Sequence, residues 1–87
     1  SPKEFSESPL FEYGLPKVGF VEIDENDETE IGDVLLMDTT NTGKLDHVAL
    51  YVGDQTILQH CVKRLSCRET YDQKWIECTK KRYRYAQ

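Results

Sequence analysis

The stretch DHVALYVGDQTILQHC, residues 46–61, carries the strongest structural signal in the chain. Two runs rich in β-branched and aromatic residues, HVALYV and ILQHC, are separated by the turn-forming residues GDQT, and this pattern predicts a β-hairpin. Both histidines of the chain lie here, His47 at the head of the first strand and His60 near the end of the second. A hairpin needs neither histidine, so their presence raises a functional question.

The register of this hairpin decides which polar side chain lies beside His47. Side chains alternate along a strand, so His47 and Ala49 point to the same face. A two-residue loop at positions 54–55 pairs Ala49 with His60, whereas a three-residue loop pairs it with Gln59. In both registers a polar side chain comes within reach of the His47 ring, as is needed to orient an imidazole for acid-base chemistry. A histidine with a purely structural hydrogen bond is the competing interpretation.

Other short runs extend the hairpin into a sheet. VLLM at 34–37 and RYRYA at 82–86 have the composition of strands. Ser66, with Glu69 three positions later, forms a capping-box pattern that predicts one short helix or turn ending near Trp75. The predicted fold class is therefore α+β, a small antiparallel sheet with one short helix.

The first third of the chain predicts little regular structure. Residues 1–9 are rich in Ser, Pro and Glu, and Gly14, Pro16 and Gly19 interrupt the apolar residues that follow. We therefore divide the chain into an acidic, largely irregular lead-in at residues 1–31 and a sheet-forming part at residues 32–87.

Charge is distributed unevenly between these parts. Residues 1–33 hold ten acidic and two basic side chains, a net of −8, and residues 34–87 hold six acidic and nine basic ones, a net of +3. The acidic segment either lies over the basic body, to which it is attracted, or forms a solvated linker, which is the simpler interpretation. Near the C-terminus, cationic side chains alternate with tyrosines as they would in an outer strand. These cations are Lys80, Lys81, Arg82 and Arg84. They are a candidate binding surface for an acidic partner, which includes residues 22–33 of a second copy.

Size and composition exclude several classes of protein. A chain of 87 residues forms one domain with a small core. Its net charge of −5 disfavours binding to nucleic acid. The longest apolar runs, VLLM and VALYV, are far shorter than the roughly 20 residues that span a bilayer. The opening SPKEF lacks a Met and the features of a signal peptide, so we expect a part of a longer protein.

A calcium site is a weak alternative for the acidic stretch. Oxygen-bearing side chains occupy alternate positions at the start of a calcium-loop pattern: Asp24, Asn26 and Glu28. However, Thr29 replaces the required Gly at the sixth position, and Leu35 replaces the required Glu at the twelfth. We therefore predict no metal site and no cofactor.

The three cysteines, Cys61, Cys67 and Cys78, form no recognisable motif. They contain no C-x-x-C pair, so a zinc or iron–sulfur site would need an outside ligand, and one disulfide would leave one thiol over. Idle thiols in a reducing compartment are the simplest interpretation. Cys61, next to the Gln59-His60 pair, is the alternative as a nucleophile in a rearranged site.

The stretch GDVLLMDTTNTGKLDHVALYVGDQTILQHCVKRLSCRETY resembles the C-terminal half of the NlpC family of papain-like cysteine peptidases, and in particular its phage tail assembly branch. The match covers roughly residues 32–85. Members show a Gly-Asp pair before a hydrophobic strand, a His-x-x-x-Tyr-x-Gly strand, an Asp-containing turn, and a polar residue twelve positions after the histidine. The matching residues are Gly32, Asp33, His47, Tyr51, Gly53, Asp54 and Gln59, and Arg64, Leu65 and Ser66 match a segment typical of the tail branch.

The resemblance implies a specific chemistry. A cysteine thiolate would attack a peptide carbonyl in a bacterial cell-wall stem peptide, with His47 as the general base and Gln59, or alternatively His60, orienting its ring. The family's nucleophile precedes the Gly-Asp pair, at the start of a helix. Residues 1–31 contain no cysteine, and all three cysteines follow His47. The chain by itself is therefore not expected to be a working peptidase.

Two hypotheses follow from the resemblance. In the first, the chain belongs to a phage or prophage tail-tip assembly protein with a cell-wall endopeptidase-like domain, and another segment supplies the cysteine. Its partners would be that segment, other tail-tip proteins and the peptidoglycan stem peptide, and its location the virion tail after assembly in the host cytoplasm. In the second, the domain is a catalytically inactive structural or interaction module of the tail.

Overall fold

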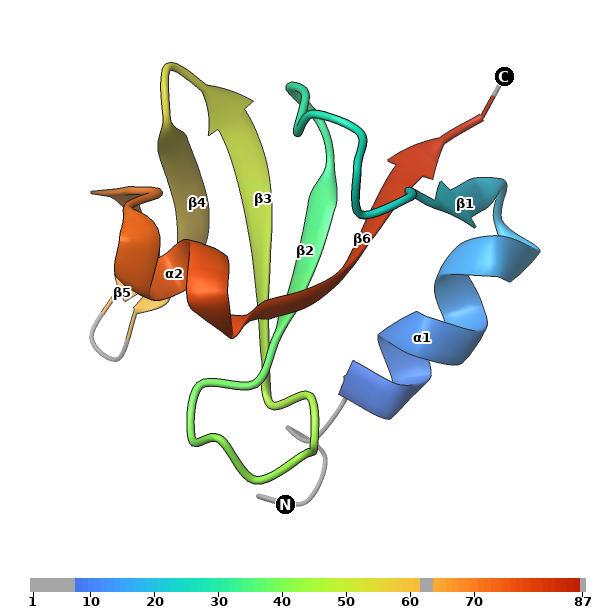
Figure 1. The fold of residues 1–87 in the computed structure, drawn as a ribbon, viewed down its shortest axis with the longest axis horizontal. Helices are drawn as coiled ribbons and strands as arrows, with labels where there is room; N and C mark the ends of the chain where they lie inside the picture. The colour runs from blue at the N-terminus through green and yellow to red at the C-terminus, as the bar shows by residue number, and fades with distance from the viewer. Residues whose placement is uncertain (1–7, 62–63, 87) are drawn as a thin grey trace.

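Six antiparallel strands form the centre of the structure, a computed structural model that describes residues 8–61 and 64–86 (Figure 1). In chain order the strands are β1 (Phe20–Glu22), β2 (Val34–Met37), β3 (His47–Gly53), β4 (Thr56–Cys61), β5 (Arg64–Thr70) and β6 (Thr79–Tyr85). Their order across the sheet is β1-β6-β2-β3-β4-β5. The predicted α+β class with a small antiparallel sheet is confirmed. The described residues contain two short helices, α1 (Ser8–Lys17) and α2 (Gln73–Cys78), where the sequence predicted one.

One face of the sheet packs against α2 and the residues just before it. The side chains of β2, β3 and β4 alternate in direction, and those pointing to this face form the larger core cluster. Its fully or nearly fully buried members are Leu35, Met37, Ala49 and Ile57, and its partly buried members are Tyr51, Tyr71, Trp75 and Cys78. His47 lies on this face as well, because it is two positions before Ala49 in β3.

The opposite face packs against α1. Leu15 from α1 meets Leu36 of β2 and Tyr83 of β6, and all three are buried. Partly buried apolar residues complete this second cluster: Phe20, Val34, Leu45 and Val48. Neither described helix has the length and apolar character needed to cross a membrane.

Residues 8–22 correct the prediction of a largely irregular lead-in. They form α1 and the edge strand β1, which pairs with β6 in the same sheet as the remaining strands. Pro16 falls in the last turn of α1, and the helix is followed by Gly19 at a φ of +101°, which suits glycine at a helix end. Gly and Pro therefore bound this helix where the sequence pattern indicated irregular chain.

The helix predicted from Ser66 and Glu69 is also corrected. Residues 64–70 form β5 instead, because they pair with β4 along its length. The short helix α2 begins after Asp72, whose side chain accepts a hydrogen bond from the backbone N–H of Trp75.

Strand β6 is a third correction. It lies between β1 and β2 and is not an outer strand, so Tyr83 at its centre is buried. The alternation of charged and aromatic residues reflects two covered faces, because Lys81 contacts α1 and Arg82 contacts the segment between β1 and β2.

Candidate active site

His47 occupies the first position of β3 and is half-buried. Its backbone pairs with Met37 of β2, which is fully buried. The loop that precedes it is fixed by two carboxylates. Asp46 accepts hydrogen bonds from the backbone and hydroxyl of Thr39 and from the hydroxyl of Thr40. The histidine is therefore held at a defined point where an ordered loop joins the sheet.

The second carboxylate of this loop, Asp38, is buried and accepts hydrogen bonds from the backbone N–H groups of Thr42 and Gly43. Burial alone would raise the pKa of Asp38, but these backbone hydrogen bonds outweigh it, and the pKa is lower than the ordinary value of 3.8. The pKa of Asp46 is lowered in the same way, since its bonds from residues 39–40 outweigh the effect of burial. Both groups are thus held in the charged form that orders residues 38–46.

A β-bulge sets the register of the hairpin. The loop consists of Asp54 and Gln55, both with positive φ (54° and 55°), and Gly53 pairs with Thr56 across it. One extra residue then enters β3 between Tyr51 and Gly53, which shifts the pairing by one position. The two-residue loop that the sequence offered is therefore present. However, because of the bulge, Ala49 pairs with Gln59, which is the register expected from the sequence for a three-residue loop.

The bulge brings Gln59 beside His47. Ala49 pairs with Gln59, so both lie on the face that carries the imidazole. The distance between His47 Nε2 and Gln59 Oε1 is 2.6 Å, and Gln59 is buried. Of the two residues that the sequence offered as partners of the ring, the structure places Gln59 beside it. The side chain of His60 is outside the part of the chain that the structure describes.

This hydrogen bond fixes the protonation pattern of the neutral ring. An amide oxygen only accepts, so the imidazole hydrogen resides on Nε2 and the lone pair on Nδ1. No described side chain forms a hydrogen bond with Nδ1. The ring therefore presents a base at Nδ1, while Nε2 is anchored to a buried amide.

Trp75 covers the imidazole from the side of α2. The two ring centroids are 5.8 Å apart with an angle of 30° between the planes, a stacked arrangement. Trp75 also packs against the core cluster. Its contact with His47 was missed, because no periodic pattern links a residue of α2 to one of β3.

The cysteines are arranged differently from the simplest expectation. Cys67 is disulfide-bonded, so the prediction of idle thiols is wrong for this residue. Cys78 is a free thiol at the end of α2, partly buried against the core cluster. The side chain of Cys61 lies outside the described part, so its suggested role as a nucleophile stays a prediction.

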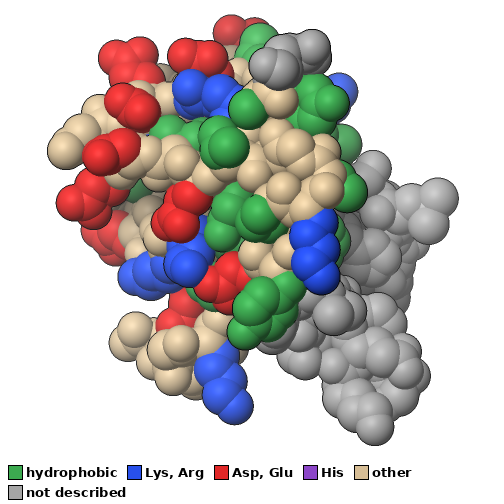
Figure 2. All heavy atoms as spheres, turned by 90° about the vertical axis from the view of Figure 1, so that its right-hand side faces the viewer, with side chains coloured by type: hydrophobic (Ala, Val, Ile, Leu, Met, Phe, Trp, Pro, Cys, Tyr) green, Lys and Arg blue, Asp and Glu red, His purple; other side chains and the backbone are tan. Residues whose placement is uncertain are grey.

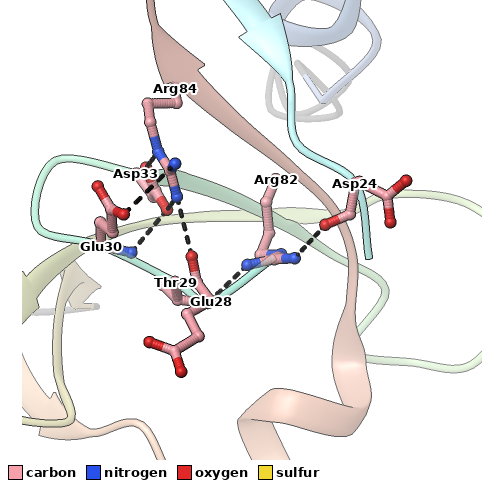
Figure 3. A network of polar contacts seen from close by, with 7 residues as sticks. All are labelled: Asp24, Glu28, Thr29, Glu30, Asp33, Arg82 and Arg84. Carbon is pink, nitrogen blue, oxygen red and sulfur yellow. Dashed lines mark hydrogen bonds and ion pairs between the residues drawn. The ribbon is translucent and has the colours of Figure 1, made fainter. Parts of the chain in front are cut away.

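Asp33, of the Gly-Asp pair that precedes β2, is part of a polar network (Figure 3). Asp33 is fully buried and accepts hydrogen bonds from Arg84 Nε at 2.8 Å and Nη2 at 2.9 Å. Arg84 also donates to the backbone oxygen of Glu28 and lies 3.6 Å from a carboxylate oxygen of Glu30. Gly32 donates from its backbone to Tyr51 of β3. The pair thus ties residues 23–33, the acidic loop, to both β6 and β3.

The acidic loop is not a free linker. Arg82 donates to the hydroxyl of Thr29 and to the backbone oxygen of Asp24, which adds a second anchor from β6 (Figure 3). Acidic side chains gather along one side of the molecule with Lys and Arg side chains between them (Figure 2). Of the two interpretations that the charge distribution left open, the structure shows the acidic segment lying over the basic strand.

A hollow of about 970 Å³ separates the acidic loop from α2 and the start of β6. Its walls include Glu25, Tyr71, Ile76 and Lys80, but neither His47 nor Gln59. Asp24, the first residue of the calcium-like pattern, accepts a hydrogen bond from the backbone of Asn26 in this loop. Within the described residues, no group of three or more His, Cys, Asp or Glu side chains is placed to hold a metal ion.

The comparison with known protein families accords with this arrangement. Residues 9–84 match the NlpC/P60 family. Because the match covers most of the 87 residues, the chain belongs to this family of cell-wall peptidases. The match begins well before residue 32, so it includes β1 and all but the first residue of α1, which the sequence resemblance left out. Among curated proteins, none matches the chain closely enough to count as a relative.

Proposed function

We propose that these residues form the base-bearing half of a cell-wall cysteine endopeptidase domain in a phage or prophage tail-tip protein similar to phage tail assembly protein K. The observation that carries the proposal is the 2.6 Å contact between His47 Nε2 and Gln59 Oε1, on neighbouring strands. It leaves Nδ1 as a base and gives the ring a fixed partner, which are the two requirements for activating a thiol.

In this proposal a cysteine outside these 87 residues supplies the nucleophile. Its thiol proton passes to Nδ1 of His47, and the thiolate attacks the carbonyl carbon of a peptide bond in a peptidoglycan stem peptide. The imidazolium then returns the proton to the departing amine, and water releases the acyl group from sulfur. Gln59 keeps the ring oriented through both transfers, although a neutral amide stabilises the imidazolium less than a carboxylate would.

The proposed partners are the Cys-bearing segment, neighbouring tail-tip proteins and the stem peptide. The proposed location is the virion tail, after assembly in the host cytoplasm. Support for this narrower role comes from the Arg64-Leu65-Ser66 segment and the Gln59-His60 pair, which resemble the tail branch of the family.

The experiment is cleavage of purified muropeptides by the full-length protein that carries these residues, with products identified by mass spectrometry. We expect His47→Ala to abolish cleavage and Gln59→Ala to reduce it, because each change removes or releases the base. The matched control is Lys44→Ala, an exposed residue of the loop before His47. Cleavage at the wild-type rate by His47→Ala would refute the proposal.

A second function has its own supporting observation. Cys67 is disulfide-bonded and Cys78 lies beyond the histidine in the chain, so neither stands where the family places its nucleophile. A catalytically inactive structural module of the tail fits these positions. It predicts no cleavage by the wild-type protein, together with impaired tail assembly when Lys80 and Lys81 are both changed to Gln. Normal assembly by that double variant would count against the structural role.

A further inference from the structure

Two different groups constrain the imidazole of His47. Gln59 forms a hydrogen bond with Nε2 of the ring, and the indole of Trp75 stacks against the ring. We propose that Trp75 is a positioning residue for the base: its indole fixes the rotation of the His47 ring and so keeps Nδ1 directed away from Gln59. This inference rests on the proposed role of His47 and adds a residue to the same site.

The backbone of Trp75 is held in place by two hydrogen bonds. The backbone N–H of Trp75 donates to Asp72, and its backbone oxygen accepts from the hydroxyl of Thr79 at 2.9 Å. That hydroxyl is also 2.7 Å from the hydroxyl of Tyr71. Trp75 is half-buried and packs against the core cluster. It therefore belongs to the rigid framework around the histidine.

The geometry explains why a second constraint is needed. The ring turns about the Cβ–Cγ bond, and Nε2 lies close to that axis, so a single hydrogen bond at Nε2 opposes the rotation only weakly. An aromatic ring stacked on the imidazole blocks this motion. The indole face also attracts a cation, so the stack persists when the ring becomes an imidazolium.

Several titratable groups surround the pair. Lys74 of α2 lies over the indole, with its Nζ 5.0 Å from the ring centroid. The elements packed around the histidine also carry Cys78, Tyr51 and Tyr71, and Asp46 precedes it in the chain. Lys74 provides a control for the test below. Its charge acts on the same indole, but its removal leaves the stack between His47 and Trp75 intact.

The first test is the fluorescence of Trp75, the single tryptophan of the chain. An imidazolium in contact with an indole quenches its emission, so we expect the emission of the wild-type protein to fall as the histidine is protonated. The transition should be absent in His47→Gln and retained in both His60→Gln and Lys74→Gln. A transition that persists in His47→Gln, or is missing from the wild type, would overturn the proposal.

The second test separates positioning from a purely structural role. In wild-type protein and Trp75→Phe, the nitrogen NMR signals of His47 should show the hydrogen on Nε2, and its ring C–H signal should carry a ring-current shift. In Trp75→Leu the shift should vanish and the two tautomers should mix. An unchanged tautomer in a folded Trp75→Leu would contradict the inference.

These outcomes do not depend on cleavage. If Trp75→Leu fails to fold, as its amide spectrum would show, the fluorescence titration on the native tryptophan still decides. If the full-length protein cleaves nothing but the stack and tautomer behave as expected, the proposed peptidase function fails and the positioning geometry stands. If cleavage occurs and the tautomer ignores Trp75, the positioning inference alone fails.

Discussion

The carboxylate of Asp33, which is fully buried, accepts two hydrogen bonds from the guanidinium of Arg84, a residue of the last strand. The same carboxylate accepts a third from the backbone N–H of Glu30. The hydrogen bonds that Arg84 donates to Asp33 raise the pKa of Arg84, so the guanidinium stays charged at every accessible pH. The Asp of the Gly-Asp pair is therefore a structural anchor that joins the acidic loop to β6.

Removing Arg84 should destabilise the domain more than removing its neighbour in the strand. Arg84→Gln leaves the buried carboxylate of Asp33 without its cation, and breaking such a pair from one side costs on the order of 3 kcal/mol. Arg82→Gln is the matched control, because Arg82 donates to a hydroxyl and a backbone oxygen and leaves no buried charge behind. We expect that change to cost about 1 kcal/mol. Urea denaturation measures both, and equal losses would contradict the anchor role of Asp33.

The partner of His47 can be exchanged without enlarging the site. Gln59→Glu keeps an oxygen acceptor at Nε2 and adds a charge that stabilises the imidazolium, whereas Gln59→Leu removes the acceptor. We expect the protonated ring to persist to higher pH in Gln59→Glu than in Gln59→Leu, as followed by the ring C–H signals of His47 in an NMR titration. Identical titrations of the two variants would mean that the 2.6 Å contact is not maintained in solution.

Two substitutions at the turn between β3 and β4 should change the free energy of unfolding in opposite directions. Gln55 has a φ of 55°, a conformation that costs a residue with a side chain about 1 kcal/mol relative to glycine. Gln55→Gly should therefore raise the free energy of unfolding by roughly that amount, since Asp-Gly suits such a turn.

Gly53→Ala is the converse change. Gly53 has a φ of +97°, and an added Cβ would lie 2.9 Å from the side chain of Ile31. We expect this variant to be less stable than the wild type. Chemical denaturation with an unchanged slope would establish both shifts, and a stabilising Gly53→Ala would refute the bulge geometry.

Acid should loosen the loop before His47. The folded-state pKa values of Asp38 and Asp46 lie below the ordinary 3.8, so their contribution to stability is complete above that pH and is lost as pH falls through the lower folded values. We expect the amide signals of Thr39 and Gly43 to shift, and their exchange protection to fall, below about pH 3.8. Asp38→Asn should remove this pH dependence at Gly43 while leaving it at Thr39. Protection that is constant down to pH 2 would contradict the prediction.

Much of the sheet could be predicted because its strands are local patterns. The runs 34–37 and 47–52 have the composition of strands and lie in β2 and β3, and the run 82–86 lies in β6 except for its last residue. The helix α1 could not be predicted in this way. Among its residues whose burial the structure describes, only Leu15 is buried, so no apolar helical pattern is visible. Gly14 and Pro16, which are typical of irregular chain, also lie inside it. Tertiary packing against Leu36 and Tyr83 decides its structure.

The candidate site was predictable in kind but not in detail. The sequence indicates that a polar side chain meets His47, yet it cannot choose between Gln59 and His60, because Ile57 and Leu58 are both apolar. Either can face the core, so the hydrophobic pattern fits both registers. The bulge before Gly53 and the stack with Trp75 depend on three-dimensional packing, to which no local pattern corresponds.

The bulge has a consequence for how this domain can change over generations. Gln59 and His60 are adjacent, and one extra residue in β3 determines which of them faces the imidazole. The same residues paired without the bulge would place Ala49 opposite His60, whereas a chain that had lost Val52 would keep Ala49 opposite Gln59 with a regular two-residue loop. Whether the extra residue bulges out of β3 or pairs with β4 therefore decides the chemistry of the site, and an alignment of the letters does not show which of the two occurs.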